Sequence, residues 1–151
     1  MTFPVVEATN TSEEATAVTA HDVSLPAGVA VGDLLLGLLG FISGGGITPP
    51  ATWTEIFEAG SIGEGAKLAF ALGGETTAQW TSGNSVESVH NSYRISGAHG
   101  DVQAASGGTS DPANLTPAWG AADTLWIAFL VWHTSDAGDV TAAPTDYSGL
   151  I

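Results

Sequence analysis

The sequence contains no cysteine and almost no positive charge, and each absence excludes a class of function. Without cysteine there is neither a disulfide framework nor a thiolate metal site. Two basic residues, Lys67 and Arg94, face sixteen acidic ones, which gives a formal net charge of −14. Because clustered lysine and arginine bind nucleic-acid phosphates and anionic lipids, we expect no nucleic-acid partner and no membrane partner. The negative charge indicates a solubilising surface or a surface complementary to a basic protein.

Long hydrophobic runs are missing too. A membrane-spanning helix takes about 20 apolar residues. The longest apolar runs, Leu34–Ile42 and Leu125–Trp132, are much shorter, and Gly37 interrupts the first. The N-terminus has no basic segment followed by an apolar one, so it does not predict a signal peptide. Both apolar runs are therefore predicted to lie inside a folded domain.

Apolar residues at helical spacing are also absent, and short apolar or alternating stretches recur between Gly, Pro, Ser, Asn and Asp instead. This pattern is typical of an all-β fold. We predict a single domain over residues 1–151, folded as a jelly-roll-like antiparallel β-sandwich. Residues 1–24 are expected to form N-terminal strands or an arm, and residues 106–121 a long loop. Strands are predicted at Val5–Thr9, Ala15–Val23, Asp33–Ile42, Thr52–Ala59, Lys67–Leu72, Val86–Ile95, Thr124–His133 and Tyr147–Ile151.

A weak repeat relates two parts of the chain, Gly32–Ile56 and Ala122–Ile151. Each part begins with an aspartate and an apolar run, continues through a glycine-containing turn, and ends with proline and an aromatic residue. The two parts occupy equivalent places in two halves of a sandwich, or they share only the general likeness of β-hairpins. The second copy stops at Ile151 inside a predicted strand. The alternatives are a complete chain, a shortened chain, and an edge that a neighbouring subunit completes with its own strand.

Motifs for catalysis, cofactors and metals are missing. The stretch GNSVE lacks the last glycine of a nucleophile elbow. The histidines His21, His90, His99 and His133 have no metal-ligand spacing and are interpreted as strand and loop residues. Asp136 and Asp139 flank a glycine, where a turn explains them and bound calcium is the alternative. No pair stands out for catalysis among the carboxylates Glu55, Glu58, Glu64 and Glu75. We therefore predict no enzyme, no cofactor and no metal site.

Five tryptophans are the remaining candidates for a binding role. Trp126 and Trp132 share one face of a predicted strand through their even spacing, which predicts that they lie in the core. Trp119 falls in the long loop and is the best candidate for exposure. Its expected role is packing at an interface, with stacking on a glycan as the alternative.

The order of motifs resembles that of β-sandwich structural proteins from tailed bacteriophages. The stretches LPAGVAVGDLLLGLLGFISGGGITPPATWTEI, SYRISGAHGD and APTDYSGLI carry this resemblance, which runs from about Leu25 onward; Thr52 departs from it, where the pattern prefers glycine. The resemblance implies a non-enzymatic virion protein that is assembled in the host cytoplasm and decorates or cements the capsid. Its partners would be other virion proteins, such as the major capsid or tail protein, and copies of itself. The alternatives are a tail or fibre module that binds a carbohydrate receptor, and a polysaccharide hydrolase on the same sandwich.

Overall fold

The computed structural model describes residues 3–41, 46–59, 63–99, 101–105, 116, 118–119 and 124–129. These residues form strands that pair in the antiparallel direction, and they contain no helix, hence none able to cross a membrane. The prediction of an all-β fold is confirmed. The strands are β1 (Val5–Ser24), β2 (Leu34–Phe41), β3 (Ile47–Thr48), β4 (Thr54–Ala59), β5 (Gly63–Leu68) and β6 (Thr77–Ser96).

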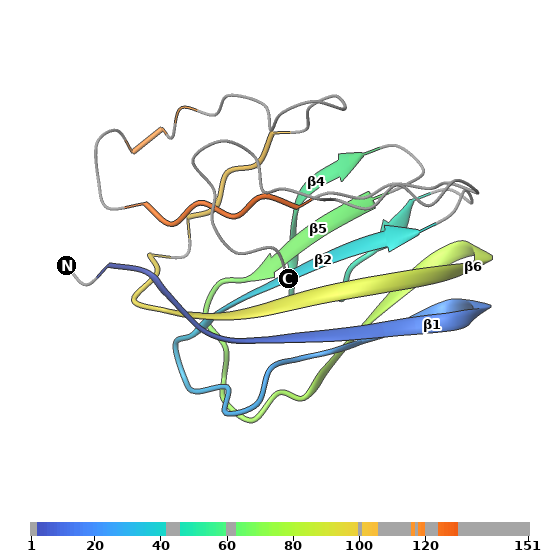
Figure 1. The fold of residues 1–151 in the computed structure, drawn as a ribbon, viewed down its shortest axis with the longest axis horizontal. Helices are drawn as coiled ribbons and strands as arrows, with labels where there is room; N and C mark the ends of the chain where they lie inside the picture. The colour runs from blue at the N-terminus through green and yellow to red at the C-terminus, as the bar shows by residue number, and fades with distance from the viewer. Residues whose placement is uncertain are drawn as a thin grey trace, which may run out of the picture.

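The strands form one six-stranded sheet in the order β1-β6-β2-β5-β4, and β3 pairs with a separate part of β6 (Figure 1). The central strand β2 is buried along its whole length. Successive side chains of a strand point to opposite faces, so an apolar run without alternation fits a strand that is covered on both faces. The two faces of β2 belong to separate apolar clusters, one with Leu35, Leu39 and Phe41 and the other with Leu34, Leu36 and Leu38.

Strands β1 and β6 form a ribbon that bends back on itself, as Figure 1 shows. The pairing register shifts between Glu14 and Val18 and again before Ala20, at the bend. Beyond the bend, the returning half of the ribbon contacts the first half. The Ser92 hydroxyl donates to the Ser24 carbonyl over 2.6 Å. The Asn10 side-chain amide donates to the Leu25 carbonyl over 3.1 Å. Bulges of this kind let a strand change direction and cover its own sheet.

The returning half of the ribbon and the main sheet share an apolar core around two tryptophans. Trp80 of β6 is fully buried, and its ring centroid lies 6.1 Å from that of Trp53, at an interplanar angle of 63°. Both rings pack against Gly37 in the middle of β2. A Cβ atom at Gly37 would lie 3.0 Å from the Trp80 ring and 3.3 Å from the Trp53 ring. The glycine that interrupts the apolar run therefore makes room for the tryptophan pair.

Residues 101–105 and 124–129 pass over the other face of the sheet, above β2 and β4 (Figure 1). Val102, Leu125, Ile127 and Phe129 pack against the second apolar cluster. Residues 124–129 belong to no strand, so the strand predicted there is wrong. Trp126 is 46% exposed and is not a core residue, because its neighbours on either side supply the contacts with the sheet.

Other predicted strands also need correction. β1 is one continuous strand rather than two, and β6 begins at Thr77, nine residues before the predicted start at Val86. The strand predicted at Lys67–Leu72 is wrong, because β5 ends at Leu68. The predicted strand Tyr147–Ile151, Trp132 and most of the second repeat copy lie outside the described residues. The 106–121 segment does too, except for residues 116 and 118–119.

Candidate functional site

Three large apolar side chains are exposed on two neighbouring loops at one end of the sheet. Val31, on the loop between β1 and β2, is 81% exposed. Phe70 and Leu72, on the loop between β5 and β6, are 64% and 84% exposed. We call these three residues the apolar patch. Exposed apolar residues that gather in one place mark interaction sites in soluble proteins.

Backbone hydrogen bonds hold the two loops together beneath the apolar patch. The Ala71 N–H donates to the Asp33 carbonyl, and the Ala71 carbonyl accepts from the Gly32 N–H, both over 2.9 Å. The Gly74 N–H donates to the Val29 carbonyl over 3.0 Å. These bonds replace the strand pairing predicted beyond Leu68. Because the Ala71 side chain is buried, the side chains directly before and after it point outward.

Arg94 of β6 holds the loop between β1 and β2 through hydrogen bonds and an ion pair. Its Nη1 donates to the carbonyl of Ala27 over 3.2 Å and to the carbonyl of Gly28. Its Nε lies 3.8 Å from Asp33 Oδ2, and the same oxygen accepts the Ala30 N–H over 2.9 Å. One of only two basic side chains in the chain is thus used to fix the shape of a loop that presents an exposed valine.

Gly28 meets two requirements of this loop. Its φ of +73° lies in the left-handed region that favours glycine, and a Cβ atom there would lie 2.6 Å from Arg94 Nη1. The chain makes a turn here, at residues 27–28. The residue type is dictated both by the backbone and by the guanidinium beside it.

Glu75 closes the second loop next to the apolar patch. Its Oε1 accepts the Leu72 N–H over 2.6 Å. Its Oε2 is buried and has no hydrogen-bond partner among the described residues. Burying a carboxylate oxygen without a hydrogen bond costs free energy, so this group makes the second loop less stable than a fully paired one.

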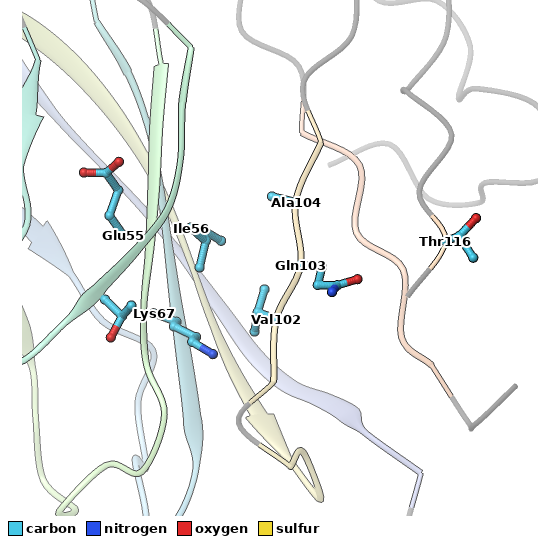
Figure 2. A pocket seen from close by; sticks show the side chains of 8 residues that line it. Glu55, Ile56, Lys67, Val102, Gln103, Ala104 and Thr116 are labelled. Carbon is cyan, nitrogen blue, oxygen red and sulfur yellow. The ribbon is translucent and has the colours of Figure 1, made fainter. Parts of the chain in front are cut away.

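An open cleft of about 580 Å³ lies between strands β4 and β5 and the segment 101–105. Figure 2 shows Ile56, Lys67 and Val102 pointing toward one another across it, whereas the Glu55 carboxylate and the Gln103 side chain point away. Lys67 lies on strand β5 and is half-buried. The polar groups of this cleft do not converge on one point, which an acid–base pair requires.

Trp119 is 37% exposed, which agrees with the exposure predicted for it. Its Nε1 donates to the Thr124 hydroxyl over 3.2 Å, and the N–H of Ala118 donates to Gln103 Oε1 over 3.0 Å. The ring is thereby tied to the segments that cover the second face of the sheet. Its indole N–H already has an acceptor within the chain, so a ligand at Trp119 would contact the ring rather than that group.

Among the other predicted candidates, the structure brings Glu58 and Glu64 opposite each other and gathers no larger group within the described residues. Glu58 is in register with Glu64 at the start of β5, whereas Glu75 follows the far end of that strand. The four residue steps from Glu64 to Leu68 span roughly 13 Å, so the loop that carries Glu75 starts farther from Glu64 than the spacing of paired glycosidase carboxylates. His99 is exposed. Within the described ranges, no three acidic or histidine side chains are placed to hold a metal ion. His133, Asp136 and Asp139 lie outside those ranges.

The sequence did contain a signal for the apolar patch. The stretch KLAFALGG alternates like a strand, but it ends in Gly73 and Gly74, which have φ angles of +91° and +84°. Two successive glycines at positive φ end a strand and start a loop. Comparison with known protein families, with curated proteins and with solved structures finds no match to this chain. The function therefore has to be argued from the residues themselves.

Proposed function

We propose that this chain is a non-enzymatic structural protein of a tailed-bacteriophage virion, assembled in the host cytoplasm, which decorates the capsid and stabilises its subunits. In this proposal, the main sheet and the returning half of the β1–β6 ribbon are the two layers of a jelly-roll-like sandwich. The sequence resemblance supports the class of protein, and the apolar patch supports the role in assembly.

The apolar patch is the observation that carries the proposal. Removing a large apolar side chain from water stabilises an interface by roughly 1.5–3 kcal/mol. Here the backbone bonds between the loops and the Arg94–Asp33 ion pair hold the exposed side chains in place before any partner binds. Such preorganisation lowers the entropy cost of binding.

The partner that fits the patch is a neighbouring capsid subunit with an apolar surface and a basic side chain at its rim. The chain carries a net charge of −14, and Glu75 borders the patch through its bond to the Leu72 N–H, so basic groups around the partner's apolar surface are favoured. Contact between copies of this chain is a second, weaker interaction, because like charges repel at low ionic strength.

Cryo-electron microscopy of particles that carry this chain tests the proposal. We expect the wild-type protein on the head surface with Val31 and Leu72 in its contact. The double variant Val31→Ser/Leu72→Ser should fold normally and lose occupancy about tenfold or more, because two apolar anchors are removed. Val89→Ser is the matched control, since Val89 is 54% exposed on β6 and pairs with the opposite end of β2.

Equal occupancy of the double variant and the control would overturn the role of the patch, and a chain found on neither head nor tail would overturn the proposal. A tail location together with glycan binding that Trp119→Ala abolishes would favour the receptor-binding alternative, to which the exposed Trp119 ring is suited.

A further inference from the structure

A chain of hydrogen-bonded serine and histidine side chains lies where the β1–β6 ribbon bends back, and its central members His21, Ser88 and His90 are buried. His21 and His90 are 0% and 2% exposed, and their rings lie nearly perpendicular, with centroids 6.4 Å apart. Three serine hydroxyls connect these rings to each other and to the backbone. The participating residues come from both halves of the ribbon: Ser12, Ser88 and His90 from the first half, and His21 and Ser82 from the returning half.

The backbone fixes the direction of this chain at one end. Ser82 donates its hydroxyl proton to the carbonyl of Asn84 over 2.7 Å. Its oxygen therefore accepts from His21 Nε2, 2.9 Å away, and Nε2 must carry the proton of this imidazole. In the neutral ring, His21 Nδ1 is then an acceptor, and the Ser88 hydroxyl donates to it over 2.7 Å.

The same logic extends to the other end. Ser88 has given its only proton to His21, so it accepts from His90 Nε2 over 2.8 Å. His90 Nδ1 is then the acceptor for the Ser12 hydroxyl, 2.9 Å away, and the Ser12 oxygen accepts the Ser24 N–H over 3.0 Å. Every hydroxyl and imidazole proton of this network is donated once, in one direction, and both imidazoles are the neutral Nε2–H form.

An additional proton has no place in this arrangement. A proton on His21 Nδ1 would leave Ser88 with a donor on each side and no acceptor for its own hydroxyl. A proton on His90 Nδ1 would take the place of the Ser12 hydroxyl proton, which then has no acceptor within this network. Buried polar groups without partners are costly, so charging either ring favours separation of the two halves of the ribbon.

The surroundings also oppose the charged rings. The pKa of His90 is lowered from 6.5 to about 4. Burial is the main cause, and the nearby His21 acts in the same direction. Burial likewise lowers the pKa of His21. Glu14 and Asp22 of β1 act in the opposite direction without reversing either change. Strands β2 and β3, which also pair with β6, contribute no titratable side chain.

We propose that the Ser–His chain is an acid-sensitive latch, which holds the bend of the β1–β6 ribbon closed while both histidines are neutral and opens the bend first on acidification. This inference is independent of the proposed virion role. It concerns a conformational device of the fold, whatever partner the protein binds.

Amide hydrogen exchange of the wild-type protein tests the latch directly. Between about pH 6 and pH 4, protection of the bend amides should fall about tenfold per pH unit for each proton gained on opening, after correction for intrinsic rates. These amides lie in Ala20–Ser24 and Thr77–Thr81, and those of β2 should keep their protection. Nitrogen-15 spectra of the imidazoles at pH 7 should show the Nε2–H form for both His21 and His90.

His90→Gln provides the decisive variant, because glutamine can hydrogen-bond but does not take up a proton. In this variant, the decrease in protection of the bend amides should become at least about tenfold shallower per pH unit than in the wild type. His99→Gln changes an exposed histidine and should behave like the wild type. Protection lost equally across all strands, or an Nδ1–H form of either ring at neutral pH, would overturn the proposal. Should His90→Gln not fold, the wild-type exchange pattern and the imidazole spectra still decide it.

Discussion

Two buried regions lie side by side on the same ribbon and are held together by different physics. His21 and Trp80 are direct register partners on β1 and β6. Around Trp80 the interior is apolar, and packing stabilises it without preferred direction. Around His21 the interior is polar, and each group depends on the orientation of the next. The comparison teaches that burial alone does not decide how a region responds to change: the apolar region is sensitive to volume, the polar region to protons.

The largest expected effect comes from the apolar region. Trp80→Ala should lower the free energy of unfolding by about 3–5 kcal/mol, because a large cavity opens between Trp53 and Gly37. Urea denaturation at pH 7 measures this value. Trp80→Phe is the matched variant and should cost much less, since it keeps an aromatic ring and removes an indole N–H that is buried without a partner in the described part of the chain. A loss below about 1 kcal/mol for Trp80→Ala would show that this region is not the stabilising core.

The second effect separates the two regions by pH. His90 has a lower pKa in the folded state than in the unfolded chain, so the unfolded state binds more protons below about pH 6.5. The stabilisation from neutral His90 is complete above pH 6.5 and is lost as the pH falls toward about 4. The loss from His90 alone amounts to about 3 kcal/mol.

Urea denaturation across this pH range, compared between the wild type and His90→Gln, isolates the histidine from the carboxylates that also titrate. Trp80→Phe should follow the wild-type pH profile in parallel, because it changes volume and not charge. Identical pH profiles for the wild type and His90→Gln would contradict the assignment of the acid response to the polar region.

The smallest effect concerns the surface loop. Arg94→Lys should change the free energy of unfolding by at most about 1 kcal/mol, because the ion pair with Asp33 is partly exposed. Lysine cannot reproduce the guanidinium contacts with two carbonyls and a carboxylate, so the Ala30 and Gly32 amides should exchange faster. Hydrogen exchange measures this local change. Unchanged exchange at both amides would show that backbone bonds alone fix the loop.

The sequence predicted strand β2 to within a residue at each end, because an apolar run bounded by Asp33 and a glycine-rich stretch allows few alternatives. It did not predict that β1 is continuous through TNTSEEATAVT, where polar and small residues show no clear period. The pairing of β1 with β6 supplies the order that local preference does not. Tertiary context commonly overrides propensity in this way.

The polar region was missed for a related reason. Ser88, His90 and Ser92 occupy alternate positions of β6, so they share one face, and all three are buried. The apolar residues of a strand ordinarily form its inward face, but Val89, between Ser88 and His90, is 54% exposed. The alternating Ser–His–Ser pattern was present in the sequence. Their partners lie far away in the sequence: Ser12 is 78 residues from His90, and His21 is 67 residues from Ser88. The pairing and the bend of the ribbon bring them together.

The placement of Lys67 in β5 and of Arg94 in β6 also has a consequence for proteolysis. Trypsin cuts only after lysine or arginine, and this chain offers it no other site. Both scissile bonds lie within or at the end of hydrogen-bonded strands, so a protease must wait until those strands detach. Cleavage after Arg94 therefore reports detachment of β6, and cleavage after Lys67 reports detachment of β5. Because the chain has only two basic residues, the two tryptic cleavages report separately on the detachment of β5 and of β6.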